Sequence, residues 1–364
     1  QVGLQNTCIL EKYFKKISLG TKFSTKKKSN LLTCFGSYDI RGELGKNLDS
    51  SIVYRIGRAV AQHFTAKLVV VGYDARESSP ELAKALISGI LDFGSDVFEI
   101  GLSGTEEMYW AVTEFEACAG IEVTASHNPI NYNGLKFVKS GSKPFDDCED
   151  FEAIKQLAQS EKWEIDRSIG STKLIAKSAR KKYVEKVLSF VDFQNVKQQR
   201  IVINCGNGAA GPTFDALAKE ISKNEIPLEF VRMHHKPDHT FPNGIPNPLL
   251  KENHPPTQQM ILKSDADFGV AFDGDFDRCF FFDENGNFIS GEYIVGLLAS
   301  AFLRKQPKSR IVHDPRVVWN ILDVVKSNAG FAIASKTGHA FIKHAMRSSK
   351  AVYGGELSAH HYFR

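Results

Sequence analysis

LVVVGYDARESSPELAKALISGILDFGSDVFEI, residues 68–100, contains one complete strand–helix–strand unit. It opens with a β-branched run, 68–72, that ends at a glycine, which is typical of a buried strand. A helix over Ser79–Phe93 follows, because serines can cap it, a proline suits its first turn and Gly94 can end it. The next apolar run, 96–100, predicts a second strand. Strands that alternate with helices predict parallel pairing with right-handed crossovers, and therefore an α/β fold.

The same alternation continues along the chain. The further predicted elements are helix 106–116, strand 118–123, strand 200–204, a helix from 213, strands 228–231, 268–272 and 279–283, helix 293–304, strand 310–313, helix 317–326, strand 331–335 and helix 339–347. Two polar stretches, 146–182 and 234–256, are predicted to be linkers with helical pieces. We therefore expect three consecutive α/β units with mixed, mostly parallel sheets, flanked by helices and arranged around a central cleft. The expected boundaries are a basic extension over 1–32, then domains over 33–150, 151–256 and 257–364.

The composition is that of an ordinary globular protein. The chain has 364 residues, 42% hydrophobic and 24% charged, which excludes a disordered protein and allows two or three domains. A net charge of +4 over 364 residues is too small to indicate a nucleic-acid-binding protein. No apolar run approaches the length of a membrane-spanning helix. We expect neither nucleic acid nor membrane as a partner, and the sequence does not determine the oligomeric state. Six cysteines without a C-x-x-C pair fit a reduced compartment, so a cytoplasmic protein is expected.

The first 32 residues are rich in lysine and carry a single acid, Glu11. Their apolar runs are too short for the core of a signal peptide. We interpret this segment as a poorly ordered extension, with a partner-binding or targeting arm as the alternative.

An acidic loop, DGDFDR, directly follows the apolar strand 268–272. Its three carboxylates are Asp273, Asp275 and Asp277. At this spacing they can converge on one hard cation, and Mg²⁺ prefers oxygen ligands. Arg278 beside such a site indicates a phosphate held by both. An EF-hand is excluded because Arg278 stands where its loop needs glycine, whereas a phosphoaspartyl enzyme with Asp273 as nucleophile is an alternative.

A second loop, TASHNP over residues 124–129, follows the strand that ends at Val123. Ser126 would lie in a tight loop at the end of that strand, with His127 as a nearby donor. The loop is expected to continue to Lys136, which would place an ammonium group close to the serine. These donors suit phosphoryl chemistry better than acyl transfer, and there is no G-x-S-x-G nucleophile elbow.

A glycine pattern after the strand 200–204 gives an alternative from another class. Gly206, Gly208 and Gly211 match the dinucleotide fingerprint, with Glu229 at about the expected distance. A nicotinamide-dependent dehydrogenase would fit this pattern. Nothing related to hydride transfer follows, however, so a tight strand–helix turn is the favoured interpretation.

Three shorter clusters stand at predicted loop positions: YDIRG over 38–42, KTGH over 336–339 and GGELSAHH over 354–361. Each one alone could belong to an ordinary surface. Together, their Arg, Lys, His, Glu and Ser side chains indicate a binding set for a polyhydroxylated, phosphorylated ligand.

Five motifs in this order resemble those of the α-D-phosphohexomutases: YDIRG, TASHNP-x-x-YNG-x-K, DGDFDR, KTGH and GGELSAHHYF. The residues of these motifs are most similar to those of the bacterial phosphomannomutase/phosphoglucomutase branch, and the resemblance covers residues 33–364. It implies interconversion of mannose 6-phosphate and mannose 1-phosphate, and of glucose phosphates as well, for nucleotide-sugar and polysaccharide synthesis. The implied route passes through a phosphoserine and a hexose 1,6-bisphosphate, which also acts as activator.

The resemblance also implies roles for single residues. Ser126 would be the phosphoserine, and an oxygen of its phosphate would complete a Mg²⁺ site made of the three loop aspartates. Arg278 would steady the phosphoryl group, and Glu356 and Ser358 would bind sugar hydroxyls. The residues implied in substrate contact or proton transfer are Arg41, Lys136, His339 and His360, and further substrate contacts are Tyr38, His127 and Lys336. Which group is base and which is acid stays open.

The family has a fourth, C-terminal domain whose loop holds the non-reacting phosphate, and no such loop occurs in this sequence. From the resemblance we expect impaired mutase activity. The alternative is a weak or inactive remnant that binds sugar phosphates.

Overall fold

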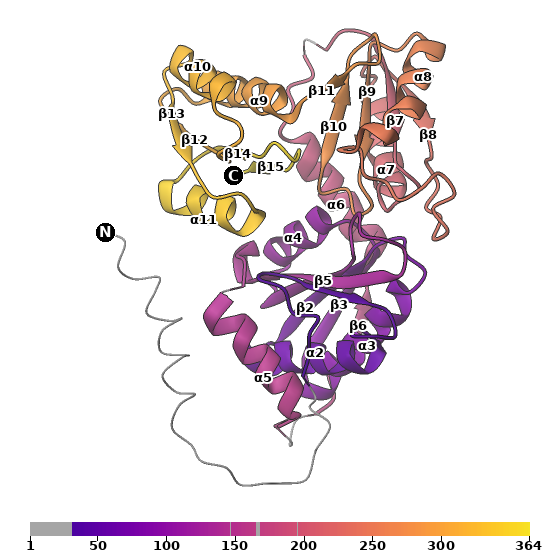
Figure 1. The fold of residues 1–364 in the computed structure, drawn as a ribbon, viewed down its shortest axis with the longest axis vertical. Coiled ribbons are helices and arrows are strands. Elements are labelled where there is room, and N and C mark those ends of the chain that lie inside the picture. The colour runs from indigo at the N-terminus through magenta and orange to yellow at the C-terminus, as the bar shows by residue number, and fades with distance from the viewer. Residues whose placement is uncertain (1–30, 146, 165–167, 195) are drawn as a thin grey trace. The chain divides into compact units, whose positions relative to one another are not determined.

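The computed structural model describes residues 31–145, 147–164, 168–194 and 196–364. Leu32–Arg364 form one compact unit that contains three sheets, each flanked by helices (Figure 1). The predicted α/β class is therefore confirmed. The predicted basic extension lies outside the described residues except for its last two, of which Leu32 is buried.

Among the described helices, none has the length and apolar character needed to cross a membrane.

The first sheet has the strand order β1-β5-β4-β2-β3-β6. Its strands are β1 (Ile40–Glu43), β2 (Leu68–Tyr73), β3 (Asp96–Leu102), β4 (Ala119–Val123), β5 (Tyr132–Lys139) and β6 (Thr172–Leu174). Its helices are α2 (Ser50–His63), α3 (Ser79–Phe93), α4 (Thr105–Glu114), α5 (Glu152–Ser160) and α6 (Ala176–Leu188), with short turns η1 (Ser140–Ser142) and η2 (Asp147–Phe151). Alternation along β2 builds two cores: Val69 and Val71 pack with α2, α3 and α5, whereas Val70 packs with α4 and α6.

The strand–helix–strand unit predicted from residues 68–100 is confirmed. Its helix, α3, has a proline in the first turn and ends at Gly94, whose φ of 99° is the left-handed conformation that favours glycine. The segment up to Lys136, by contrast, was expected to be a loop, and that prediction was wrong. Residues from Tyr132 onward form β5, which pairs antiparallel with β4 and places Lys136 opposite Glu122.

The second sheet has the order β11-β10-β9-β7-β8. Its strands are β7 (Gln199–Asn204), β8 (Leu228–Met233), β9 (Phe268–Phe272), β10 (Cys279–Phe282) and β11 (Phe288–Ile289). Its helices are α7 (Ala210–Lys223) and α8 (Pro255–Ser264), with a short turn η3 (Lys251–Asn253). α7 packs on the face of Ile203 and Val270, and α8 packs through Ile261 on the face of Val202.

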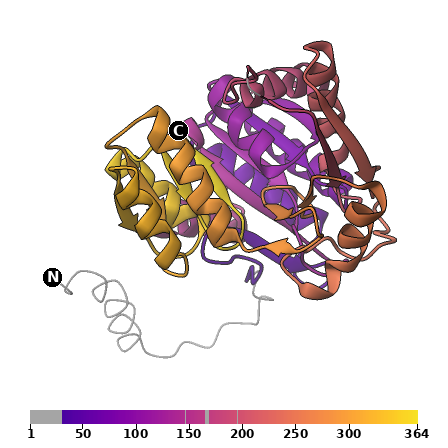
Figure 2. The ribbon, with the colours of Figure 1, turned by 90° about the horizontal axis from the view of Figure 1, so that it is seen from above.

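The third sheet has the order β13-β12-β14-β15. Its strands are β12 (Arg310–His313), β13 (Phe331–Ala334), β14 (Tyr353–Gly355) and β15 (His361–Phe363), and its helices are α9 (Gly291–Lys305), α10 (Trp319–Ser327) and α11 (His339–Ser349). α9 and α10 pack with Ile311 on one face, and α11 packs with Val312 on the other (yellow in Figure 2).

The expected boundaries after residues 150 and 256 do not follow these sheets. β6 pairs with β3, so the first sheet continues beyond residue 150. β9 pairs with β7, so the acidic loop after β9 belongs to the second sheet and not to the third unit. The boundaries were placed at the polar stretches, but the chain returns after each stretch to add a strand to the sheet that came before it. We propose units over 32–188, 199–289 and 291–364.

Candidate active site

The serine loop connects β4 to β5 and holds Ser126 in an unusual backbone conformation. Ser126 has a φ of 50° and is only 4% exposed. Its backbone N–H donates to Thr124 Oγ1 at 2.8 Å, and that hydroxyl donates to Asp74 Oδ2 at 2.7 Å. Left-handed backbone in a serine is uncommon and persists when surrounding contacts hold it. The serine is therefore fixed by its neighbours rather than by its own preference.

The acidic loop after β9 meets the serine loop directly. Ser126 Oγ donates to Asp273 Oδ2 at 2.8 Å, joining residues 147 positions apart. Arg278 lies over both groups, with Nε 2.9 Å from Asp273 Oδ2 and Nη2 3.3 Å from Ser126 Oγ. A hydroxyl, a carboxylate and a guanidinium thus converge at one buried point.

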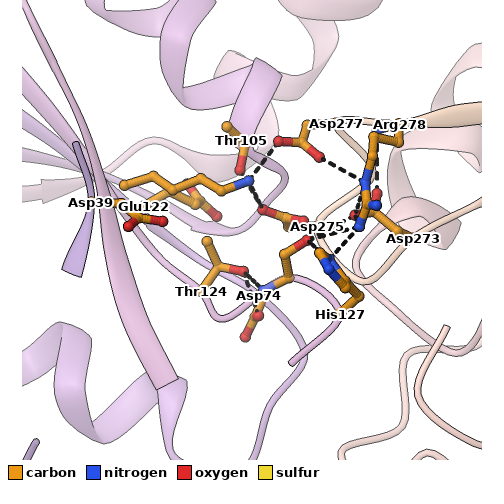
Figure 3. A network of polar contacts seen from close by, with 12 residues as sticks. Asp39, Asp74, Thr105, Glu122, Thr124, His127, Asp273, Asp275, Asp277 and Arg278 are labelled. Atoms are coloured by element: carbon orange, nitrogen blue, oxygen red, sulfur yellow. Dashed lines mark hydrogen bonds and ion pairs between the residues drawn. The ribbon is translucent and has the colours of Figure 1, made fainter. Parts of the chain in front are cut away.

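His127 completes this cluster as a neutral group. Its Nδ1 lies 3.1 Å from Ser126 Oγ and accepts a hydrogen bond from Arg278 (Figure 3). Burial, together with the charge of Arg278, lowers the pKa of His127 to about 4. At neutral pH the imidazole therefore carries no charge.

Lys136 joins the two other aspartates of the acidic loop. Its Nζ donates to Asp275 Oδ2 at 2.7 Å and to Asp277 Oδ2 at 2.5 Å, and Thr105 Oγ1 donates to Asp275 Oδ2 at 2.6 Å. Burial alone would lower the pKa of Lys136, but the two carboxylates outweigh it and raise that pKa above its ordinary value. The lysine is therefore a fixed positive charge in this arrangement.

The three loop aspartates fit a divalent cation. They can each offer an oxygen such that these oxygens all lie within 4.8 Å of one another. Among the described residues, Asp275 Oδ1 is buried without a hydrogen-bond partner, and Asp277 Oδ1 has only long contacts, 3.5 Å to His360 and 3.8 Å to Arg278. Buried carboxylate oxygens with unused acceptor capacity suit a hard cation such as Mg²⁺.

The clusters near the C-terminus meet at Glu356. This buried carboxylate accepts hydrogen bonds from the Gly338 backbone N–H and the Tyr362 hydroxyl, both at 2.7 Å. His360 Nδ1 lies 3.3 Å from Glu356 Oε2, and its Nε2 faces Asp277. Burial opposes the charge on His360, but Asp277 and Glu356 together raise its pKa to about 9. Residues 356–360, between β14 and β15, are called the sugar loop below after their predicted role. This loop of the third sheet is thereby joined to the acidic loop of the second.

The remaining candidate residues are placed less centrally. His339 packs edge-on against Tyr38, with ring centroids 4.9 Å apart, and its Nδ1 is buried without a hydrogen-bond partner. Arg41 donates to the Thr124 carbonyl oxygen at 2.7 Å, and Ser358 lies 3.0 Å from His360 Nδ1. Lys336 is exposed, and its nearest described cationic contact is with the ring of Phe341, 5.7 Å away.

Sequence reasoning missed several residues that build the site. Asp74 and Arg76 form hydrogen bonds to residues of the serine loop, and Thr105 donates a hydrogen bond to Asp275. Asp314 accepts hydrogen bonds from Arg316 and from the Leu357 backbone N–H of the sugar loop. All of them follow the C-terminal ends of strands, which was the signal available in the sequence.

The glycine-rich turn after β7 packs against the acidic loop. A Cβ on Gly208 would lie 2.6 Å from the Gly274 carbonyl oxygen, and the Ala209 N–H donates to that same oxygen at 3.0 Å. Glu229 pairs with Arg200 on the neighbouring strand instead of facing the turn. The segment is a tight turn between β7 and α7, as the favoured interpretation predicted, and the dehydrogenase alternative loses its basis. Its packing against the acidic loop was not predicted.

Comparison with known proteins agrees with this geometry. Domains I, II and III of the family described as phosphoglucomutase/phosphomannomutase, alpha/beta/alpha domain, match residues 32–164, 181–286 and 290–364. The chain is 50% identical over 335 residues to a phosphomannomutase of Escherichia coli, covering 92% of this chain and 73% of that protein. It is 46% identical over 336 residues to a protein of Xanthomonas campestris described as phosphohexose mutases, with coverage of 92% and 73%.

A solved structure agrees as well. The phosphoglucomutase/phosphomannomutase family protein of Burkholderia thailandensis superposes with a TM-score of 0.82 at 30% identity, covering 93% of this chain and 72% of that one. The fold that contains the three sheets is thus shared with a solved structure of this family. The chain belongs to the phosphoglucomutase/phosphomannomutase family, the α-D-phosphohexomutases.

Proposed function

We propose that this chain interconverts mannose 6-phosphate and mannose 1-phosphate by phosphoryl transfer through Ser126, and that it accepts glucose phosphates as well. The observation that carries the proposal is the 2.8 Å hydrogen bond from Ser126 Oγ to Asp273 Oδ2. It places a buried hydroxyl against a candidate cation site and a guanidinium, a set suited to phosphoryl transfer. The names of the E. coli and Xanthomonas relatives support the substrate class.

Asp273, Asp275 and Asp277 would hold Mg²⁺, together with an oxygen of the phosphoserine. When bound, the cation supplies charge neutralisation at the phosphoryl oxygens. Arg278 already donates toward Ser126 Oγ and would steady the phosphoryl group during transfer. A hexose 1,6-bisphosphate would be both the intermediate and the activator that loads Ser126.

In the transfer step the Ser126 Oγ–phosphorus bond breaks and a bond from phosphorus to a sugar oxygen forms. The sugar hydroxyl loses its proton to a base, and Ser126 Oγ regains a proton. Lys136 and His360 are positively charged at neutral pH, because nearby carboxylates raise the pKa of each. Burial lowers the pKa of His127 and of His339, so both imidazoles are neutral at neutral pH, and which group acts as the base stays open.

Reversal of the reaction on the other phosphate requires that the sugar bind in two orientations. We assign the hydroxyl contacts to Glu356 and Ser358 of the sugar loop. The further substrate contacts are Tyr38, Arg41, His127, Lys136, Lys336, His339 and His360. We also place the reaction in the cytoplasm, where thiols such as Cys118 and Cys279 stay reduced.

The test is turnover of mannose 1-phosphate to mannose 6-phosphate, followed by ³¹P NMR with Mg²⁺ and a trace of hexose 1,6-bisphosphate. We expect Ser126→Ala to lower turnover about 10³-fold or more, because the nucleophile is gone. The matched control is Ser88→Ala, since Ser88 is exposed on α3 and bonds only a helix carbonyl within the described contacts. It should turn over like the wild type. An inactive wild type, or an active Ser126→Ala variant, would contradict the proposal.

A further inference from the structure

One of the residues that support the serine loop is a buried arginine. Arg76 follows β2 and is 2% exposed. Its guanidinium donates to backbone carbonyl oxygens of four residues: Ser126 at 2.9 Å, Asn128 at 2.6 Å, Pro129 at 2.9 Å and Tyr132 at 3.0 Å. One side chain thus binds three carbonyl groups of the loop between β4 and β5 and that of Tyr132, the first residue of β5.

The positive charge of Arg76 is balanced by Asp74, which also binds the start of the loop. Its Nε lies 3.5 Å from Asp74 Oδ2, and its backbone N–H donates to Asp74 Oδ1 at 3.0 Å. Asp74 also accepts the hydroxyl of Thr124, which in turn accepts the N–H of Ser126. The contacts therefore close a ring in which Asp74 holds the start of the loop and Arg76 holds its interior.

This ring explains how Ser126 keeps its left-handed backbone. In a planar trans peptide the carbonyl and the following N–H point in opposite directions. Since the Ser126 carbonyl points to Arg76, the N–H of His127 points to the opposite side. Four carbonyl dipoles that converge repel one another unless a cation with a planar set of donors lies between them. A lysine would supply the charge but not the fork of donors.

We propose that Arg76 is a positioning residue for phosphoryl transfer: it holds the serine loop so that Ser126 Oγ stays against Asp273 and Arg278. The inference rests on the proposed phosphoryl transfer through Ser126. Arg76 itself touches no reacting atom, because its side-chain contacts among the described residues are with the loop backbone, Asp74 and the ring of Phe241, whose centroid is 5.9 Å away. Its effect should therefore appear in the rate of the chemical step and not in substrate affinity.

The test measures how fast Ser126 takes up a phosphoryl group from glucose 1,6-bisphosphate with Mg²⁺, by rapid quench and intact-protein mass spectrometry. Arg76→Met keeps the length of the side chain but removes every donor. We expect its maximal rate of uptake to fall about 10²-fold, since a displacement of about 1 Å costs that much. The half-saturating bisphosphate concentration should stay within about 3-fold of the wild-type value, because Arg76 does not contact the bisphosphate and its removal leaves binding unchanged.

Two further variants separate positioning from mere stability. Arg76→Ala leaves a space for guanidinium added at millimolar concentration. Added guanidinium should raise the uptake rate of this variant about tenfold or more, whereas methylammonium should not. Arg55→Met is the matched control, since Arg55 is a largely buried arginine that donates to the Ala158 carbonyl oxygen far from the serine loop in sequence. It should lose thermal stability but keep the wild-type rate of uptake.

The outcomes separate this inference from the proposed function. A wild type that takes up no phosphate overturns the proposed function itself. A wild type that is labelled, with Arg76→Met labelled equally fast, overturns only the role of Arg76. If Arg76→Met does not fold, Arg76→Lys decides: a folded variant about tenfold slower supports the inference. A Lys variant as fast as wild type, or one that also fails to fold, assigns Arg76 to stability alone and overturns the inference.

Discussion

Asp273 is in contact with three kinds of group: a hydroxyl, a guanidinium and other carboxylates. It accepts a hydrogen bond from Ser126, receives two from the Arg278 guanidinium, and faces the other carboxylates of its loop. Burial raises the pKa of Asp273 to about 6, although Arg278 opposes the shift. Asp277 differs, because Lys136 and His360 overcome the effect of burial and hold its pKa below the ordinary value. The cation site thus contains one carboxylate that competes for a proton in an accessible pH range.

The elevated pKa of Asp273 predicts that Mg²⁺ affinity depends on pH. A ligand must lose its proton to bind the cation, so affinity should be constant above pH 6 and fall as the pH drops below about 6. The slope should approach about tenfold per pH unit for one proton. Calorimetric titration with Mg²⁺ from pH 5 to pH 8 measures it. Asp273→Asn should bind more weakly and without this slope, and equal wild-type affinity at pH 5 and pH 7 would refute the assignment.

Site residues that directly follow a predicted strand could be predicted from the sequence. The three aspartates after β9 and Ser126 after β4 follow strands directly, and the structure brings them together. Arg76 could not be predicted in the same way. The carbonyl groups that it binds lie 50 or more positions away, and the paired strands β2, β4 and β5 bring them within reach.

At the scale of elements, two loops from different sheets are held against each other by glycines. A Cβ on Gly274 would lie 2.6 Å from the Ser126 carbonyl oxygen, and one on Gly208 would lie 2.6 Å from the Gly274 carbonyl oxygen. The turn after β7, the acidic loop and the serine loop therefore stack in close succession. Side chains at these positions would have to push the loops apart, because the nearest atoms are backbone.

Gly208→Ala should therefore displace the acidic loop and weaken Mg²⁺ binding, by about tenfold as an order of magnitude for a disturbed ligand set. Calorimetry with Mg²⁺ measures the change. The matched control is Gly211→Ala, whose Cβ would meet the His235 carbonyl oxygen at 2.0 Å, away from the acidic loop. That variant should lose thermal stability and keep its Mg²⁺ affinity. Unchanged affinity in Gly208→Ala would show that the contact does not position the loop.

Strands with apolar runs were predictable as elements, whereas their pairing was not. β9 and β12 have the bounds that the apolar runs predict, and α3 has the bounds that its capping residues predict. β5 was missed because Asn133 and Lys136 are buried polar residues within a strand, where they bond to Ser79 and Asp275 instead of to water. The expected unit boundaries were wrong because β6 and β9 complete sheets begun far earlier in the chain.

For the whole molecule, the site is assembled from all three sheets. The first supplies Ser126 and Lys136, the second supplies the aspartates and Arg278, and the third supplies the sugar loop around Glu356. No single unit contains both the nucleophile and the candidate metal ligands. The family resemblance indicated these partners from motif order alone, but their distances follow from the packing of the units. The account's central claim is therefore that Ser126 and the acidic loop act as one phosphoryl-transfer site.

The most direct measurement of that claim is the intact mass of the wild-type chain before and after hexose 1,6-bisphosphate, followed by peptide mapping. With Mg²⁺ present, we expect one added phosphoryl group, located on Ser126 and resistant to hydroxylamine as a phosphoserine is. With the cation chelated, uptake should be strongly slowed, because charge neutralisation at the transferring group is lost. A hydroxylamine-labile phosphate on Asp273, or no mass increase when the cation is present, would contradict the account.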